Sequence, residues 1–148
     1  DVRDNILLTS IDRFAMCGVS CRRAENAAVQ AQIDALGIVL ASMEQPVAGL
    51  SGGNQQKTVF ARAMMTNPRV LLCDEPTQAV DVKTRGEIHR LLRQKADEGC
   101  VVVFVSSDLG EVLEVADTVQ VMRRGETGPR IENKNLTVRQ VLSCCYET

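Results

Sequence analysis

The feature that most constrains this chain is a Ser-Gly-Gly turn followed by an apolar run that ends in two carboxylates. Residues 50–57 read Leu-Ser-Gly-Gly-Asn-Gln-Gln-Lys, and the run 70–73 leads into Asp74 and Glu75. A Ser-Gly-Gly turn that opens a helix can bind an anion, because glycines let backbone N–H groups approach closely and the helix dipole adds positive potential. An apolar strand that delivers carboxylates to its carboxyl end is a common place to hold a metal and a nucleotide. The order of the two pieces predicts a protein that handles a nucleotide.

Bulk composition excludes several classes of function. The chain has 148 residues, 45% of them hydrophobic and 24% charged, and a net charge of -2. This length fits one domain with a real core. The net charge gives no general attraction to nucleic acid, so we expect no nucleic-acid partner. No apolar run reaches the length of a membrane span, so any membrane role must come through a partner.

The cysteines leave two interpretations open. The chain has six, at positions 17, 21, 73, 100, 144 and 145, and they form no paired C-x-x-C units. A zinc site built from Cys17, Cys21 and the pair Cys144-Cys145 is one reading. Reduced thiols that pack as small hydrophobic groups are the reading we favour.

Hydrophobic periodicity predicts a helical part followed by strand–helix–strand layers. Helices are predicted at 22–36, from Ser51 to Met65, from Asp81 to about Asp97, at 109–116, and after a capping box at 137–140. Strands are predicted at 70–73, 101–105 and 118–122, the first two buried on both faces. The sequence therefore predicts an α/β fold, with a helical subdomain at 1–66 and a partial parallel-sheet core with a C-terminal tail at 67–148.

Several motifs together resemble one family. They are Asn5-Ile6, Arg22-Arg23-Ala24-Glu25, the 50–57 signature, Asp74-Glu75, Val80-Asp81-Val82, Ser106-Ser107-Asp108-Leu109 and Asp117. In this order they resemble the nucleotide-binding domains of ABC transporters, which have a P-loop NTPase-like fold. The signature with Asn54 to Lys57 is most similar to the second domain of the ATP-binding subunits of bacterial ribose, galactose and xylose importers.

A phosphate loop is missing from the sequence. No G-x-x-x-x-G-K-[S/T] occurs in the chain, although this loop is the main ATP-binding element of the family. In the family it lies upstream of the region that matches Asp1. We therefore expect the chain to be the C-terminal part of such a domain, with the phosphate-loop strand missing, and to be inactive as an ATPase by itself.

The resemblance implies roles for residues of the signature and of the loop before the next helix. Ser51, Gly52 and Gly53 would contact the γ-phosphate of ATP held by the opposite domain, and Gln55 lies on the first turn of the same helix. Asp81 matches the loop that touches the partner domain, and it can also be a helix N-cap. Lys57 has two readings of equal weight, a member of this site or a solvated surface lysine.

The resemblance also implies the catalytic residues. Asp74 would hold the Mg²⁺ shell, and Glu75 would act as general base on the attacking water. Ser107 stands where many ABC domains have a histidine that contacts the γ-phosphate, so we expect a site weakened in hydrolysis. His89, the chain's one histidine, falls in a charged helical stretch and is predicted to lie on the surface instead of serving as that switch.

The resulting functional hypothesis is part of an ATP-binding subunit that couples ATP binding and hydrolysis to sugar import. It implies ATP and Mg²⁺ as cofactors, a second nucleotide-binding domain and a transmembrane permease as partners, and a place on the cytoplasmic face of the membrane. The alternatives are a non-transport ABC ATPase, which usually has Glu or Gln after the two glycines, and a non-enzymatic interaction fragment.

The missing strand has a structural consequence. In the family it lies between the strands that match 101–105 and 118–122, so its absence leaves backbone N–H and C=O groups unpaired on both sides of a gap. We therefore expect the chain to close the gap, to swap a segment with a second copy, or to form a homodimer through strand edges.

Overall fold

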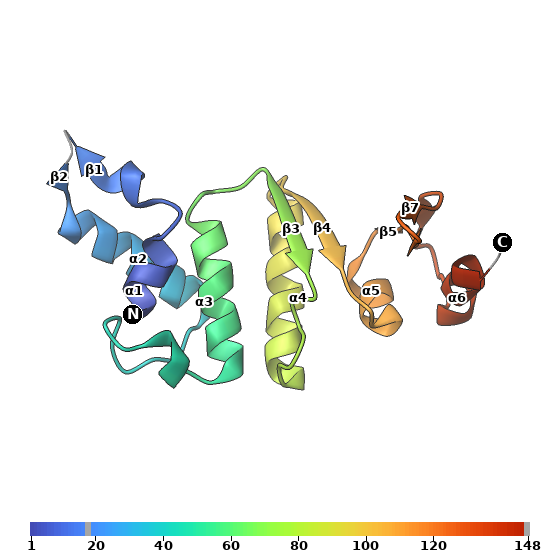
Figure 1. The fold of residues 1–148 in the computed structure, drawn as a ribbon, viewed down its shortest axis with the longest axis horizontal. Coiled ribbons are helices and arrows are strands. Elements are labelled where there is room, and N and C mark those ends of the chain that lie inside the picture. The colour runs from blue at the N-terminus through green and yellow to red at the C-terminus, as the bar shows by residue number, and fades with distance from the viewer. Residues whose placement is uncertain (17–18, 147–148) are drawn as a thin grey trace. The chain divides into compact units, whose positions relative to one another are not determined.

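The computed structural model describes residues 1–16 and 19–146. The chain forms two compact units, the first made of residues 1–71 and 77–102 and the second of residues 72–76 and 103–148. In the parts that the structure describes, no helix is long and apolar enough to cross a membrane. Figure 1 shows the order of the elements along the chain.

The first unit is mainly helical. Its helices are α1 (Val2–Leu7), α2 (Arg22–Leu36), α3 (Gly52–Met64) and α4 (Val82–Asp97), with 3-10 turns η1 (Ile11–Phe14) and η2 (Val47–Gly49). Helices α1, α2 and α3 pack together around a buried apolar cluster formed by Val2, Ile6, Leu7, Val29, Ile33, Ile38, Leu50, Ala61 and Met65. This cluster fixes the position of α3, whose first residues carry the Ser-Gly-Gly turn.

The residues that cap these helices are the ones predicted from the sequence. Helix α2 ends at Leu36, and Gly37 follows it in the left-handed conformation with φ 57°, which glycine adopts without a Cβ clash. Ser51 and Asp81 are the N-caps of α3 and α4. The predicted helices at 22–36, 51–65 and 81–97 are therefore confirmed to within one residue at each end.

The sequence did not predict a pair of short strands in the first unit. Strands β1 (Ala15–Met16) and β2 (Val19–Ser20) pair antiparallel, with Ala15 opposite Ser20. Two-residue strands carry no readable alternation, so the sequence predicted mainly helix up to residue 66. Cys17 lies outside the described residues.

Strands β3 (Val70–Asp74) and β4 (Val101–Val105) form a two-stranded sheet. The amide of Val101 donates to Arg69 O at 2.9 Å at one end, and the amide of Glu75 donates to Val105 O at 2.9 Å at the other, so the strands run parallel (Figure 1). The prediction that both faces are buried is wrong. Leu71 and Cys73 are buried, but Leu72 is 74% exposed and Val103 45% exposed. A continuous apolar run predicts that other elements pack against both faces of the strand. In this chain alternate residues of the two strands have no such packing and are exposed.

The second unit continues with short elements. These are α5 (Leu109–Val115), β5 (Thr118–Val119), β6 (Met122–Arg123), β7 (Glu126–Thr127), β8 (Ile131–Glu132) and α6 (Val138–Tyr146). Strand β5 pairs antiparallel with β8, and β6 pairs antiparallel with β7. The single strand predicted at 118–122 is therefore two short strands in separate sheets. Helix α6 packs against α5, and the capping box before α6 is present, because Thr137 N donates to Gln140 Oε1 at 2.8 Å.

The architecture combines helices with a parallel strand pair, which agrees with the predicted α/β class. Within the described residues β4 and β5 belong to different sheets, so the chain does not close the expected gap by joining them. Swapping and dimerisation through strand edges stay predictions.

Candidate functional site

The signature turn begins at Ser51. Its Oγ accepts a hydrogen bond from Asn54 N at 3.5 Å and a second from Asn54 Nδ2 at 3.0 Å. Asn54 Oδ1 in turn accepts from Val39 N at 2.9 Å, and Gln55 Nε2 donates to Leu50 O at 2.9 Å. The polar side chains after the glycines therefore hold the turn, while Ser51 and Gly52 are exposed at the start of α3. An exposed helix N-terminus with two glycines can receive an anion.

Lys57 is the residue for which two readings were left open, and it is not a solvated surface lysine. Its side chain is 12% exposed, its Nζ lies 2.5 Å from the Glu87 carboxylate, and it donates to Gly37 O at 3.1 Å. The Lys57 hydrogen bond lowers the pKa of Glu87 below its ordinary value. Lys57 thus ties α3 to the end of α2 and to α4, and it lines a cavity of about 360 Å³ between these helices.

Asp81 caps α4 through both carboxylate oxygens. Oδ1 accepts from Thr84 N at 3.0 Å, and Oδ2 accepts from Thr84 Oγ1 at 2.8 Å. These bonds to the backbone and side chain of Thr84 lower the pKa of Asp81. Just before it, Ala79 has a left-handed φ of 59°. The carboxylate is therefore fixed and ionised at the start of the helix.

The signature turn and the Asp81 loop lie against each other in the first unit. A Cβ added to Gly52 would lie 3.7 Å from Ala79 O, and one added to Gly53 would lie 2.6 Å from Thr84 Oγ1. The distance at Gly52 is an ordinary van der Waals contact, so it is the absence of a side chain at Gly53 that lets the start of α3 approach the start of α4. The first unit therefore brings together Ser51, Gly52, Gly53, Gln55 and Asp81, all of which the sequence singled out.

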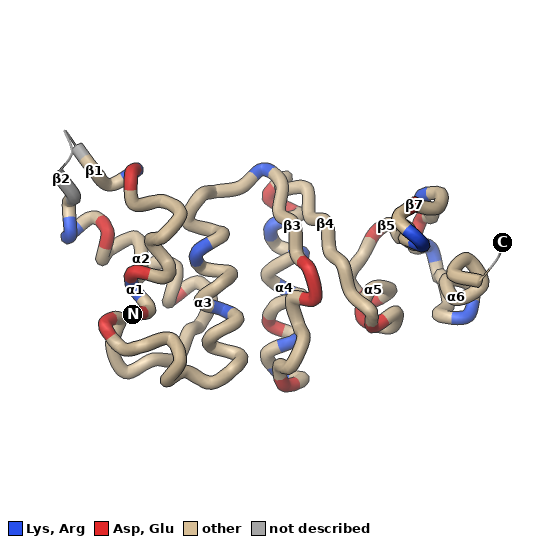
Figure 2. The backbone as a smooth tube through the Cα atoms, in the orientation of Figure 1, with Lys and Arg blue, Asp and Glu red and all other residues tan. Residues whose placement is uncertain are grey.

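The second unit holds the other predicted residues. Glu75 follows β3 with a left-handed φ of 44°, and its Oε1 accepts from Ser107 N at 2.7 Å. Asp74, the last residue of β3, is exposed beside it. Acidic positions mark this end of the strand in Figure 2. The Glu75 carboxylate is thus oriented by a backbone N–H, a bond that any residue except proline could supply at position 107.

This carboxylate pair has a definite chemical capacity. Asp74 and Glu75 offer oxygen ligands of the kind Mg²⁺ prefers, and an oriented carboxylate can accept a proton from water. Ser106 Oγ donates to Glu111 at 2.8 Å and accepts from Asp108 N at 3.1 Å, which fixes the segment carrying Ser107. The residues present therefore suit a metal-assisted hydrolysis.

Two other predictions can be compared with the structure. His89 is 7% exposed, so the prediction of a surface histidine is wrong. It is buried on the inner face of α4 together with Ile88 and Leu92. The charged residues next to it in the sequence lie on other faces of the helix, so they do not indicate that His89 is exposed. Among the described residues no group of three or more His, Cys, Asp or Glu side chains could hold a metal, and the described cysteines form no disulfide.

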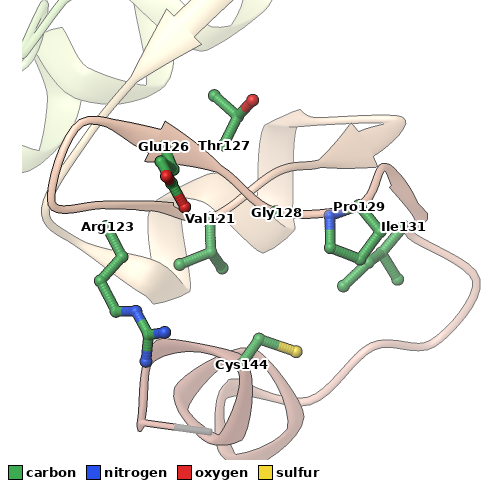
Figure 3. A pocket seen from close by; sticks show the side chains of 8 residues that line it. All are labelled: Val121, Arg123, Glu126, Thr127, Gly128, Pro129, Ile131 and Cys144. Atoms are coloured by element: carbon green, nitrogen blue, oxygen red, sulfur yellow. The ribbon is translucent and has the colours of Figure 1, made fainter. Parts of the chain in front are cut away.

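A second cavity, of about 300 Å³, lies in the second unit (Figure 3). The β6–β7 hairpin, Pro129, Ile131 and Cys144 of α6 line it, and none of the predicted site residues does.

Sequence reasoning missed Thr84 and Glu87. An Asp N-cap accepts from the backbone N–H two or three residues later, so the bond from Thr84 N to Asp81 had a signal in the sequence. The pairing of Glu87 with Lys57 had none, because it depends on how two helices pack.

Comparisons with known proteins identify the family. The family model of the ABC transporter matches residues 1–78. The chain is 38% identical over 141 residues to a ribose import ATP-binding protein of Rhizobium etli, covering 95% of this chain and 28% of that protein. It is 43% identical over 141 residues to a xylose import ATP-binding protein of Burkholderia ambifaria, covering 95% and 27%. The chain thus spans little more than a quarter of the length of these relatives.

A solved structure shares the fold. An inward-facing conformation of a putative metal-chelate type ABC transporter matches with a TM-score of 0.79 at 23% identity, over 96% of this chain and 56% of that one. At this identity the likeness speaks for the fold alone. With the family model covering more than half of its residues, the chain belongs to the ABC transporter family.

Proposed function

We propose that this chain is the part of a sugar importer's ATP-binding subunit that supplies the signature turn, the carboxylate strand and the Asp81 loop. The observation that carries the proposal is Glu75 at the carboxyl end of β3, with its Oε1 held by Ser107 N at 2.7 Å. A carboxylate oriented at the end of a parallel strand suits a general base. The relatives named for ribose and xylose import support sugar as the substrate class.

In this proposal the two groups of residues serve nucleotide sites in different ways. Asp74 would hold Mg²⁺ and Glu75 would accept a proton from water for ATP bound by the chain's own domain. Ser51, Gly52 and Gly53 would contact the γ-phosphate of ATP on a second domain. Gln55 supports the turn through its bond to Leu50 O. Mg²⁺ would supply charge stabilisation of the transferred phosphoryl group when bound. Ser107 offers no imidazole, so hydrolysis at the chain's own site is weak.

The proposed partners follow from the same reading. A second nucleotide-binding domain completes the ATP sites, and a transmembrane permease receives the coupling, which places the subunit at the cytoplasmic face of the membrane. Residues 1–66 act as the helical signature subdomain, and 67–148 act as the partial core with its tail. Alone, the chain forms a homodimer through strand edges or by swapping.

A chimera tests the proposal. The matching segment of a full-length ribose import ATP-binding subunit is replaced by this chain, and ATP turnover and Mg-ATP affinity are measured with its permease. Glu75→Gln should lower turnover more than affinity, toward the roughly 10²–10⁴-fold effect of a positioned base, and less if Ser107 has already weakened the site. Ser51→Arg should lower turnover through the opposite site. Glu132→Gln, at an exposed carboxylate paired with Lys134, is the control.

Two results would overturn the proposal. A large loss from Glu75→Gln with no loss from Ser51→Arg would contradict the division of labour between the sites. For the chain alone, calorimetry with Mg-ATP should detect no strong binding, because the phosphate loop is missing. A micromolar dissociation constant would refute that part, whereas ATPase activity of the chimera would exclude a merely structural interaction fragment.

A further inference from the structure

The contact between the signature turn and the Asp81 loop runs through one side chain, Thr84. Thr84 is buried, and its backbone N and Oγ1 both donate to the Asp81 carboxylate, at 3.0 and 2.8 Å. The same side chain faces Gly53. A Cβ built on Gly53 would lie 2.6 Å from Thr84 Oγ1, 3.0 Å from Cγ2 and 3.3 Å from Cβ. Thr84 thus touches the signature helix with the atom that also binds Asp81.

The space between Gly53 and Thr84 has no room for a side chain. Carbon atoms in van der Waals contact lie about 3.5–4.0 Å apart, so no side chain fits at Gly53 unless Thr84 moves. A rotation of Thr84 about its Cα–Cβ bond would take Oγ1 away from Asp81 Oδ2. A displacement of the signature turn toward α4 is therefore opposed by the cap of α4, and a loosened cap frees space for the turn.

A second bridge lies one helical turn further along both helices. Lys57, four residues after Gly53, pairs with Glu87, three residues after Thr84, at 2.5 Å. Residues separated by three or four positions lie on the same helical face, so both contacts join the same two faces of α3 and α4. The ion pair holds the helix faces together while Thr84 sets their approach at the N-terminal ends.

We propose that Thr84 is a positioning residue that couples the signature turn at Gly53 to the Asp81 loop, so that a shift of either is transmitted to the other. The inference rests on the proposed function in treating the turn and the loop as parts of one nucleotide-dependent device. The coupling itself is a property of this chain and needs no ATP to be observed. Coupling between two positions is reciprocal, so it can be tested from both ends.

The first test is a double-mutant cycle read at Asp81 in the 148-residue chain. Gly53→Ala adds a methyl group whose three nearest atoms all belong to Thr84. It should raise the pKa of Asp81 toward its ordinary value, measured by NMR titration of the carboxyl carbon. In a Thr84→Ala background the same Gly53→Ala change should shift the pKa of Asp81 no further, because the connecting side chain is gone.

Gly86→Ala is the matched control. Gly86 lies in α4, and a Cβ added there meets nothing within 4 Å. Gly86→Ala should raise the thermal midpoint because alanine favours a helix, and should leave the pKa of Asp81 unchanged. Gly53→Ala should lower the midpoint by roughly 3–10 °C, as overpacking does in a chain of this size.

The reverse test uses Thr84→Val, which keeps the volume beside Gly53 and removes the Oγ1 bond to Asp81. Amide exchange at Asn54, whose N–H donates to Ser51 Oγ, should become several-fold faster although nothing in α3 is changed. Thr84→Ser, which keeps the hydroxyl, should restore slow exchange. This arm also covers the case in which Gly53→Ala does not fold.

The results of these tests distinguish coupling through Thr84 from a simple packing contact. If Gly53→Ala lowers the thermal midpoint while the pKa of Asp81 stays as it was, Thr84 is a packing contact and the coupling is refuted. If Thr84→Val leaves exchange at Asn54 unchanged, transmission in the other direction is refuted as well. Coupling in this chain together with an inactive chimera would sustain the role of Thr84 and overturn the proposed ATPase function.

Discussion

Ala79 occupies a backbone conformation that suits glycine, so Ala79→Gly should stabilise the chain. Its φ is 59°, and it lies in the loop that leads to Asp81. A residue with a Cβ in this region costs about 1–2 kcal/mol, because the Cβ crowds the following carbonyl oxygen. Glycine removes that cost but adds about 0.5–1 kcal/mol of chain entropy to the unfolded state. The net expectation is a gain of about 0.5–1 kcal/mol, or a rise of about 2–4 °C in the thermal midpoint.

Differential scanning calorimetry measures this change, and Ala31→Gly is the matched control. Ala31 is exposed in the middle of α2, where the backbone is helical, so the same substitution should lower stability by about 1 kcal/mol. Opposite signs at the two positions would identify the φ angle as the cause. An equal loss at both positions would refute the argument, because glycine would then act only through the entropy of the unfolded chain.

Two further substitutions test local physics. Arg124→Asn should increase amide protection against hydrogen exchange in the β6–β7 hairpin by about 2–5-fold, because asparagine suits a two-residue turn of this kind. Arg124 and Gly125 both have positive φ in that turn. Unchanged protection would contradict the turn assignment. Lys57→Met should cost about 0.5–1 kcal/mol at neutral pH by removing the pair with Glu87. The pKa of Glu87 is lowered in the folded state, so the ion pair stabilises the fold above the ordinary value of 4.5 and this stabilisation is lost as pH falls through the folded pKa. The variant should therefore lose less stability than the parent on acidification. An equal loss of stability in both proteins would refute the role of the pair.

Local signals in the sequence predicted the helices well. The side chains of Ser51 and Asp81 accept hydrogen bonds at the start of a helix, and Gly37, which has no side chain, ends one. The structure confirms all three positions. The Thr137–Gln140 capping box was readable for the same reason. The chemistry of a cap is contained within a few neighbouring residues.

Features that depend on packing between distant segments were not predictable in this way. Whether Lys57 is solvated depends on Glu87 and Gly37, which come from two other segments of the fold. His89 was misjudged because the charged residues around it lie on other faces of α4. The site residues show the same division, since the motifs could be read locally but the contact of Gly53 with Thr84 could not.

The exposed apolar face of the strand pair leads to the last prediction. Within the second unit, Leu72, Val103 and Val105 are 74%, 45% and 52% exposed. Apolar side chains at this density on a strand pair favour association, and among the described strands β4 has β3 as its partner. We therefore expect light scattering to show a mass above that of a monomer at micromolar concentration.

Substitution should reveal which part of the strand pair drives that association. Leu72→Thr with Val103→Thr places β-branched residues suited to strands at both positions and removes apolar area from the exposed face. The variant should therefore shift toward monomer while its circular dichroism stays the same. Val39→Thr, at an exposed apolar position of the first unit, is the control and should leave the mass distribution unchanged. Association that persists in the double variant would point to backbone pairing at the β4 edge, because side-chain changes leave the edge N–H and C=O groups intact. A parent chain that stays monomeric at all concentrations would refute both routes.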